Sequence, residues 1–351
     1  MRKRLLTFVL ASLLLLAAMP AAAAAETGYT DVPSGHWAEE SIRRATDLGL
    51  FQGVGKGRFG LGRPISRAAF ATALCRLFDW EEVRPDRPSY ADVAKDSWYY
   101  AAVETLLSND AVAASGHEFR PEEDLTRGEM ASMLVRGLGY TSLAGTAASY
   151  GGPFTDVSVN RGFITLAYDL GLVSGKGNGR FDPDGSATRE QAAAVLIRVH
   201  DQLAASSTPL ASAEGLRLIT PATPTAREGQ ELPITPLEPL PELYAALRRL
   251  KNNGEDMSQM VLRLTAGGMR TVTDAGGNPV AASTLISAKE VQEILARRDV
   301  NRYYSDQYES AYCTYAPNAY QTATVWYQSE ESMAAKLQLA RLFGVTRYIL
   351  A

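Results

Sequence analysis

The chain has 351 residues, of which 46% are hydrophobic and 21% charged, and its formal net charge at pH 7 is -4. This mild acidity argues against nucleic acid or an anionic lipid surface as the main partner. The two cysteines and three histidines are scattered along the chain, so neither a disulfide framework nor a metal site is expected, and no cofactor is implied.

The first residues predict a secretory signal peptide. Arg2, Lys3 and Arg4 form a basic start, residues 5–18 are almost entirely apolar, and the alanines at 21–25 offer small-residue cleavage sites. Pro20 interrupts the apolar run at roughly 15 residues, short of the about 20 that a membrane-spanning helix needs. We expect residues 1–25 to be removed, which leaves a secreted chain with a formal charge of -7 and no membrane contact.

Three segments of the chain repeat one pattern. Each opens with an aromatic residue, a polar residue and Asp-Val, and the aspartates are Asp31, Asp92 and Asp156. Six residues after the aspartate, the first two copies carry Trp37 and Trp98. A helical stretch, a turn and a phenylalanine follow, and eight residues beyond the phenylalanine each copy has an arginine: Arg67, Arg127 and Arg189. This self-similarity predicts a repeat architecture, with the copies at 27–82, 88–142 and 152–203.

Each repeat is predicted to contain two helices joined by a loop. The apolar residues behind each arginine recur at helical spacing. Capping boxes are predicted for Thr126 with Glu129 and for Thr188 with Gln191, and Ser66 supplies an N-cap alone in the first copy.

Each arginine then falls in the first turn of the second helix, where the dipole opposes a cation by about 0.3 to 1 kcal/mol. A cation placed there three times indicates a seat for a carboxylate or phosphate. The alternative is that each arginine pairs with the aspartate of a neighbouring copy and only holds the repeats together.

The two tryptophans also have two interpretations. They could be core residues at a helix start, or they could present an indole face to a sugar ring while the nearby aspartate accepts from sugar hydroxyls. Trp, Asp and Arg together indicate a binder of acidic sugar. No copy contains a nucleophile beside a base, or the paired carboxylates of glycoside chemistry.

These motifs resemble S-layer homology domains, whose usual marks are Phe-x-Asp-Val, a Trp, a Gly-rich turn before Phe-x-Pro, and an Ile-Thr-Arg-Ala-Glu helix start. The resemblance covers residues 27–203 and implies an all-α, pseudo-threefold bundle of three repeats. It further implies inter-repeat grooves that bind secondary cell wall polysaccharide, a peptidoglycan-linked glycan that commonly bears pyruvylated sugars. On that analogy each helix-start arginine meets the pyruvyl carboxylate, Asp and Trp frame the sugar, and glycines such as Gly55 and Gly177 let the backbone approach.

The copies depart unequally from the family pattern. Ala69 stands where the family has Glu, the second copy lacks the Gly-rich turn, and the third copy is about three residues shorter before its first helix and has no tryptophan. We therefore expect better sites in the first two copies than in the third.

The composition shifts to Ala, Ser, Thr and Pro after residue 203, which predicts an extended linker over 204–240. A smaller α+β domain is predicted over 241–351. Its pattern predicts helices at 243–250, 288–297 and 329–343, a Gly-rich hairpin at 274–277, and β structure at 260–264, 303–315, 322–327 and 346–350.

This second region resembles the last part of glycoside hydrolase family 18. The resemblance rests on Ser287-Ala288-Lys289-Glu290, on Val325-Trp326-Tyr327 and on residues 331–345. The Asp-x-x-Asp-x-Asp-x-Glu strand that carries the family's general acid is absent from the sequence, and residues 213–351 fall short of the about 200 that an eight-stranded barrel needs. The resemblance thus implies a truncated, non-catalytic relative that could still bind glycan through Tyr and Trp.

The sequence predicts a secreted, non-enzymatic protein that the three repeats anchor at the cell wall or cell surface, with the second domain displayed outward. Two alternatives stay open. One is an exported glycoside hydrolase that acts on N-acetylglucosamine-containing glycan and uses the repeats for targeting. The other is a structural lattice protein.

Overall fold

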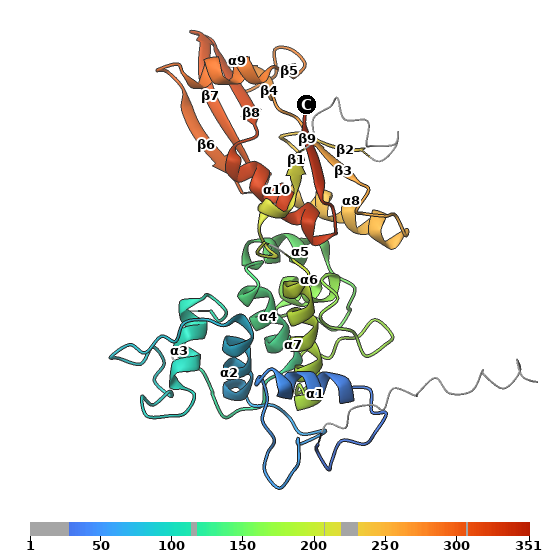
Figure 1. Cartoon of the computed structure of the whole chain (residues 1–351). Coiled ribbons are helices and arrows are strands. Elements are labelled where there is room, and N and C mark those ends of the chain that lie inside the picture. Colours follow the sequence, from blue (N-terminus) through green and yellow to red (C-terminus); the bar gives the residue numbers. More distant parts are fainter. Residues whose placement is uncertain (1–27, 114–117, 207, 219–230, 307) are drawn as a thin grey trace, which may run out of the picture.

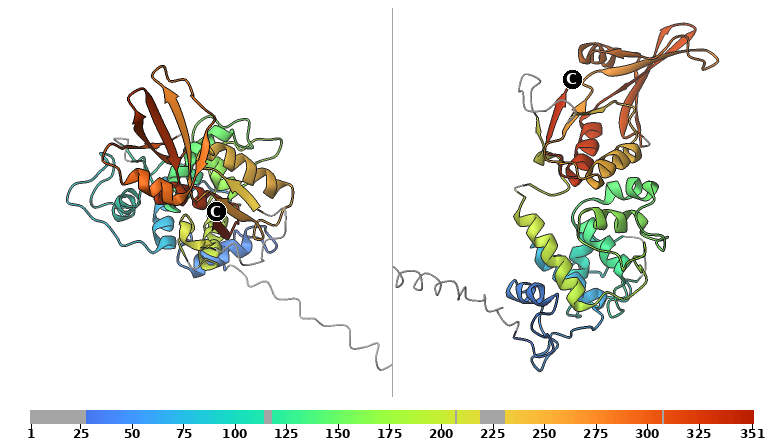
Figure 2. Two further views of the ribbon diagram at one scale, coloured as in Figure 1. Left: turned by 90° about the horizontal axis from the view of Figure 1, so that it is seen from above. Right: turned by 90° about the vertical axis from the view of Figure 1, so that its right-hand side faces the viewer.

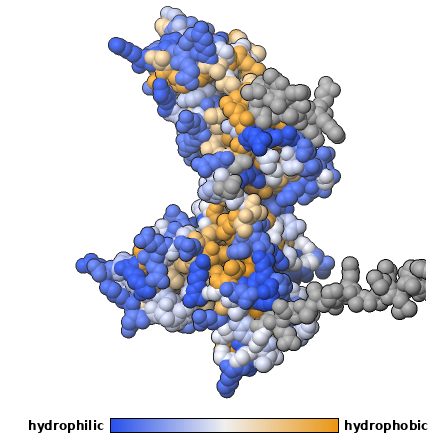
Figure 3. All heavy atoms as spheres, in the orientation of Figure 1, coloured by the Kyte–Doolittle hydropathy of each residue, from blue (hydrophilic) through white to orange (hydrophobic). Residues whose placement is uncertain are grey.

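The computed structural model describes residues 28–113, 118–206, 208–218, 231–306 and 308–351, so the predicted signal peptide lies outside the described residues. The described chain has a helical lower part and an upper part with two sheets, joined at a waist (Figure 1) (Figure 2). The prediction of a multidomain chain, with helical repeats followed by a smaller domain of helices and strands, is confirmed. Figure 3 shows apolar residues gathered on the lower part just below the waist.

Each repeat contributes two helices to the lower part. They are α1 (Glu39–Asp47) and α2 (Arg67–Phe78), α3 (Tyr100–Ser108) and α4 (Arg127–Gly137), and α6 (Arg161–Asp169) and α7 (Arg189–Ala204). The predicted caps are present: Ser66 Oγ accepts from the Ala69 N–H at 3.3 Å, and Thr126 and Glu129 form a reciprocal capping box. At the start of α7, the Thr188 N–H donates to Gln191 Oε1 at 3.3 Å.

An additional helical segment, η1 (Thr141–Leu143) with α5 (Ala144–Tyr150), lies between the second and third repeats. It packs against α6 through a very close approach at Gly162, where a Cβ would lie 1.8 Å from the Ala144 carbonyl oxygen. The repeat pattern does not include this segment, and Gly162 is the residue that permits its packing.

Backbone hydrogen bonds link the three repeats into a closed ring. Just before its second helix, each repeat has one buried apolar residue that joins the ring. The Ile65 N–H donates to Ala187 O at 3.0 Å, Leu125 N–H to Ile65 O at 2.8 Å, and Ala187 N–H to Leu125 O at 2.8 Å. Each copy therefore contacts both others at the entrance to its second helix, so the three arginine-bearing helix starts are held in one cluster.

The upper part contains two sheets. A parallel sheet has the order β1-β9-β3-β2 and is covered by α8 (Leu240–Asn252) and α10 (Glu330–Leu342). Its strands are β1 (Arg217–Leu218), β2 (Glu231–Ile234), β3 (Val261–Leu264) and β9 (Arg347–Leu350).

The second sheet is antiparallel and has the order β5-β4-β8-β7-β6. Its strands are β4 (Gly268–Asp274), β5 (Thr284–Ile286), β6 (Asn301–Ser305), β7 (Ser310–Asn318) and β8 (Gln321–Tyr327). Helix α9 (Ala288–Leu295) buries Val291 and Ile294 against one face of this sheet. Cys313 lies in that small core as a free thiol, and Cys75 in α2 is also free.

The prediction of an extended linker over 204–240 has to be corrected, because part of that segment belongs to the fold. The short 3-10 helix η2 (Ala213–Gly215) precedes β1, which pairs with β9, and β2 pairs with β3. Leu232 and Ile234 of β2 pack on the main core. The prolines misled the prediction: Pro233 lies on an edge strand, where the missing N–H is tolerated.

The lower and upper parts share one hydrophobic core, and a polar cluster lies within their interface. The Asp169 carboxylate of α6 accepts a hydrogen bond from the Tyr244 hydroxyl of α8 and lies 3.3 Å from Arg248 Nη2. Burial raises the pKa of Asp169, although the Tyr244 hydrogen bond and the charges of Arg248 and Lys251 act in the opposite direction. The two parts are therefore packed directly on each other.

Candidate functional site

Each of the three predicted arginines reaches across to the next repeat. The Nε–H of Arg67 donates to Phe119 O at 2.7 Å, that of Arg127 to Phe181 O at 3.0 Å, and that of Arg189 to Phe59 O at 2.9 Å. Each guanidinium carbon also lies over the ring of the same phenylalanine, at 4.9, 4.5 and 4.9 Å from the ring centroid. Because the third repeat reaches back to the first, these contacts close a second ring around the three copies.

The arginines thus hold the repeats together, as one of the two sequence interpretations expected, but through a different partner. They bind the phenylalanine carbonyls and not the aspartates of the neighbouring copy. Burial lowers the pKa of all three guanidinium groups, since removal from water disfavours the charged form. The guanidinium groups of Arg67 and Arg127 also line grooves beside the helix starts.

The three aspartates bind backbone N–H groups of their own repeats, a role that the sequence did not predict. Asp31 accepts from the N–H groups of Phe59 and Gly60 at 2.7 and 2.8 Å. Asp92 and Asp156 make the corresponding bonds to Phe119 and Arg120 and to Phe181 and Asp182. Both carboxylate oxygens are used in each case, so the spacing shared by the three copies serves to close the loop that carries the phenylalanine carbonyl.

The two predicted glycines lie in tight turns. Gly55 and Gly177 have φ of 92° and 95°, in the region that favours glycine. Their carbonyls accept from Arg58 N–H and Arg180 N–H at 3.1 and 3.0 Å. The first and third copies therefore share one turn geometry, as their sequences predicted.

The tryptophans are not core residues. Trp37 is 61% exposed and Trp98 is 64% exposed, so the core interpretation is wrong for both. Trp37 lines a groove formed mainly by the other two repeats, whereas Trp98 projects from the start of α3. Their exposure leaves the indole faces available to a ligand.

One groove, which we name the Arg127 groove, lies between the second and third repeats. Trp37 comes from the first repeat, and the remaining lining comes from α4, the loop after α6, and α7. Its cations are Arg127, Lys176 and Arg198, and no carboxylate is among its lining residues. The lining residues are Trp37, Arg127, Met130, Val173, Ser174, Gly175, Lys176, Gln191, Ala194, Val195 and Arg198.

Hydrogen bonds fix two of these cations in the groove wall. Arg127 Nη2 donates to Ser174 O at 2.9 Å, and Arg198 Nη1 donates to Leu172 O at 2.7 Å. Lys176 forms an ion pair with Asp182, outside the lining. The groove combines an exposed indole with a cationic wall.

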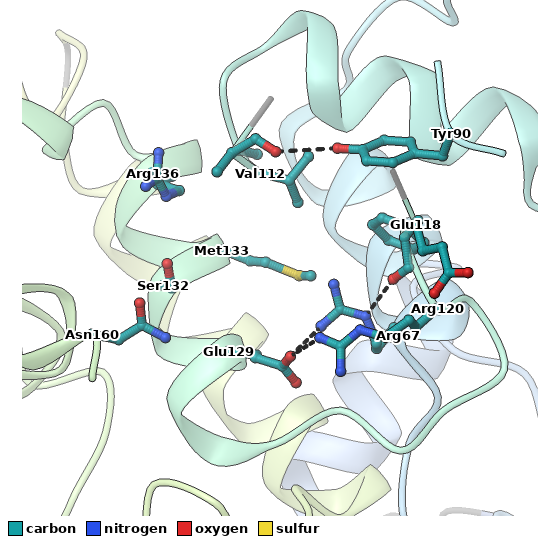
Figure 4. A pocket seen from close by; sticks show the side chains of 13 residues that line it. Arg67, Tyr90, Val112, Glu118, Arg120, Glu129, Ser132, Met133, Arg136 and Asn160 are labelled. Atoms are coloured by element: carbon teal, nitrogen blue, oxygen red, sulfur yellow. Dashed lines mark hydrogen bonds and ion pairs between the residues drawn. The ribbon is translucent and has the colours of Figure 1, made fainter. Parts of the chain in front are cut away.

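A second groove, the Arg67 groove, lies between the first and second repeats and differs in charge. Here Glu129 lies between two guanidinium groups, 2.8 Å from Arg67 Nη1 and 2.7 Å from Arg120 Nη2 (Figure 4). Burial would raise the pKa of Glu129, but the hydrogen bond from the Thr126 amide and the charges of Arg67 and Arg120 lower it overall. The carboxylate therefore stays ionised and forms ion pairs with Arg67 and Arg120.

The residue two positions after the helix-start arginine distinguishes the two grooves. Gln191 follows Arg189 at the same spacing at which Glu129 follows Arg127, and it lines the Arg127 groove as a neutral amide. At the position of the tryptophan, the Arg67 groove has Asn160, the N-cap of α6. Arg189 itself donates through Nη2 to Gln52 O at 2.7 Å.

The sequence prediction omitted several groove residues. Lys176, Gln191 and Arg198 line the Arg127 groove, and Arg120, Glu129 and Arg136 line the Arg67 groove. A signal existed for two of them, because Arg136 and Arg198 recur nine residues after the helix-start arginine in their repeats.

Comparison with known proteins agrees with the repeat assignment. The S-layer homology domain model matches residues 28–71, 89–131 and 153–193. The chain is 26% identical over 198 residues to an S-layer protein, sap, of Bacillus anthracis, and 33% identical over 181 residues to an S-layer protein of Bacillus licheniformis. These alignments cover 56% and 50% of this chain but only 24% and 20% of the relatives, so the chain spans about a quarter of their length or less.

These matches show that the chain carries three S-layer homology domains and is a protein of the bacterial cell surface. They support an anchoring role for the lower part. Among the helices of the described residues, none combines the length and the apolarity that a membrane span requires.

Among solved structures, a putative sporulation-specific glycosylase, ydhD, of Bacillus subtilis matches with 17% identity and a TM-score of 0.28. The match covers 38% of this chain and 43% of that one.

Proposed function

We propose that the lower part anchors the protein by binding an acidic cell wall polysaccharide in the Arg127 groove. The single observation that carries this proposal is the composition of the groove: three cations, an exposed indole and no lining carboxylate. A guanidinium binds carboxylates with directed hydrogen bonds, and an indole stacks on the apolar face of a sugar ring.

The pyruvylated sugars that the family resemblance implies fit this chemistry. A pyruvyl group adds one carboxylate to a sugar ring. The cation and the stacking face must therefore lie close enough to contact the same sugar. The ring of backbone hydrogen bonds among Ile65, Leu125 and Ala187 supports a pseudo-threefold bundle. In this bundle Trp37 of the first repeat lies at the groove between the other two.

We propose a non-catalytic role for the chain. The general-acid motif of glycoside hydrolase family 18 is absent from the sequence, and the recurring aspartates are bound to loop amides. An aspartate with both oxygens engaged by backbone N–H groups is poorly placed to act on a substrate.

Co-sedimentation with purified, protein-free cell walls tests the proposal. Lys176→Glu places a carboxylate in the groove, and we expect it to release most of the wall-bound protein. Lys95→Glu is the matched control, because Lys95 is an exposed lysine of the second repeat that does not line this groove. Equal wall binding by the Lys176→Glu variant, the Lys95→Glu variant and the wild type would refute the assignment.

A second pair of variants tests whether the Trp37 indole contributes to wall binding. Trp37→Ala removes an exposed side chain that the core does not need, so the fold should persist while wall binding falls. Tyr320→Ala, at 79% exposure in the upper part, removes an aromatic of similar exposure far from the groove. We expect the Tyr320 variant to bind walls as the wild type does.

A further inference from the structure

The antiparallel sheet of the upper part ends at an unprotected edge strand, β6. It pairs with β7 on one side, and no other strand of the described chain pairs with it (Figure 1). Such an edge leaves alternate N–H and C=O groups unpaired and ready to pair with another strand. Proteins commonly protect an edge with proline, a bulge or several charges, but β6 has no proline and Arg302 is its only charged residue.

A row of aromatic rings crosses the sheet and ends at this edge. In register, Tyr303 of β6 faces Tyr312 of β7, which faces Trp326 of β8. The Tyr303 and Tyr312 rings stack with centroids 5.0 Å apart, and the Tyr312 and Trp326 rings stack at 4.5 Å. Tyr303 is 46% exposed, so the row stops with one ring face uncovered.

The position of Tyr303 within the strand makes the edge self-complementary. Tyr303 is the central residue of the five in β6. If a second β6 lies antiparallel and centred on this residue, the two Tyr303 rings come opposite each other and the row continues into the other copy. Cross-strand aromatic pairs of this kind are stabilising in antiparallel sheets.

The charges on the other face of β6 fit the same arrangement. Arg302 is exposed there, with its Nη2 donating to Leu295 O at the end of α9 at 2.7 Å, and the Tyr304 hydroxyl donates to Glu309 Oε2 at 2.8 Å. Antiparallel pairing about Tyr303 sets Arg302 of one copy opposite Tyr304 of the other. A cation thus meets a ring whose hydroxyl is bound to a carboxylate, and twofold symmetry provides this contact twice.

We propose that β6 is a docking surface for a second copy of this chain, which joins it by antiparallel strand pairing about a twofold axis at Tyr303. Asn301 then pairs with Ser305 of the other copy, and the two sheets become one. No residue of either groove takes part in this pairing.

Sedimentation equilibrium of the secreted chain tests the pairing. We expect the wild type to form dimers and Tyr303→Lys to remain monomeric, because two lysines opposite each other repel. Leu285→Lys is the matched control: Leu285 is 69% exposed and ends the same side-chain row at the opposite edge of the sheet, so this variant should dimerise like the wild type. A monomeric wild type, or a dimer that persists in Tyr303→Lys, overturns the proposal.

A cysteine pair tests the register. Opposed residues in an antiparallel pair have Cα atoms about 4.5 to 5.5 Å apart, within the usual disulfide range of roughly 4.4 to 6.8 Å. Tyr303→Cys should therefore form a covalent dimer under mild oxidation, whereas Asn301→Cys, which faces Ser305, should not. Cross-linking of Asn301→Cys but not Tyr303→Cys would contradict the register. A monomeric chain in which sugar stacks on Tyr303 would contradict the choice of occupant.

Discussion

The Arg189 guanidinium of the third repeat donates its Nε–H to the carbonyl oxygen of Phe59 in the first repeat, across 130 positions of sequence. This bond closes the ring that Arg67 and Arg127 begin, and it explains why a cation stands in the unfavourable first turn of each second helix. The stabilising contacts to the next repeat outweigh a dipole penalty of about 0.3 to 1 kcal/mol. Arg67 and Arg127 also line grooves, and in the Arg67 groove Glu129 pairs with the guanidinium of Arg67.

Removal of this closing contact should destabilise the lower part. Arg189→Met takes away the hydrogen bonds to Phe59 O and Gln52 O, and we expect a loss of about 2 to 4 kcal/mol in the free energy of unfolding. Chemical denaturation followed by circular dichroism measures it. Arg87→Met, at an exposed position, should change stability by less than about 0.5 kcal/mol, and similar losses in both variants would argue against the ring.

Neutralisation of Glu129 should free the second groove. In Glu129→Gln the Arg67 groove gains the amide that Gln191 supplies to the Arg127 groove, so Arg67 and Arg120 become available to a carboxylate. We expect acidic wall glycan to bind roughly two- to fivefold more tightly, in line with the loss of one opposing partly exposed charge. Fluorescence titration gives the affinity. Weaker binding by this variant would mean that Glu129 assists the ligand.

The pair between Arg44 of the first repeat and Asp201 of the third should make stability sensitive to acid. The hydrogen bond from Arg44 lowers the pKa of Asp201 to about 2 from its ordinary value of 3.8. Because the folded pKa is depressed, the stabilisation is complete above about pH 4 and is lost as the pH falls toward 2. Half of the carboxylate is exposed, so solvent screening limits the effect to about 1 kcal/mol or less.

A double-mutant cycle isolates this pair. We expect Arg44→Gln, Asp201→Asn and the double variant to give a coupling energy that is present at pH 6 and much smaller at pH 2, where the Asp201 carboxylate is partly protonated. A coupling energy that is equal at both pH values would show that the pair does not titrate in this way.

Lys336 should make the stability of the protein depend on pH in the alkaline range. Its ammonium is fully buried in the upper part, 2.9 Å from Ser310 Oγ and 3.4 Å from the carbonyl oxygens of Thr235 and Pro236. Burial lowers the pKa of Lys336 to about 8. A depressed lysine pKa means that the charged form is disfavoured in the fold, so its stability relative to Lys336→Met should rise by up to about 3 kcal/mol between pH 8 and 10.5.

Denaturation of the wild type and Lys336→Met over pH 7 to 11 measures that difference. Ionisation of the tyrosines affects both proteins alike and cancels in the comparison. A difference in unfolding free energy that stays constant over this range would contradict the assignment of the shift to Lys336.

Much of the lower part was predictable because its signals are local. Helix periodicity and the caps at Ser66 and Thr126 depend on residues within one turn, and the second helices begin at Arg67, Arg127 and Arg189 as the spacing predicted. The grooves were less predictable because each combines different copies. Trp37 belongs to the first copy by sequence but lines a groove of the second and third.

Two further features of the fold were not predictable, for a physical reason of the same kind. The aspartates Asp31, Asp92 and Asp156 occupy the family's positions, yet only the folded loop shows that their oxygens already bind backbone N–H groups. Pro233 looked like linker composition, and only its pairing with Arg263 of β3 identifies it as part of an edge strand. The amino-acid composition of a segment does not show which strand or loop it contacts in the fold.

Isothermal titration of residues 26–351 with soluble wall polysaccharide, before and after the carboxyl groups of the polysaccharide are converted to neutral esters, tests the central claim most directly. We predict binding to the acidic form that weakens with added salt, is lost on esterification, and is abolished by Lys176→Glu but not by Lys95→Glu. Binding that survives both esterification and Lys176→Glu would contradict recognition of an acidic glycan in the Arg127 groove.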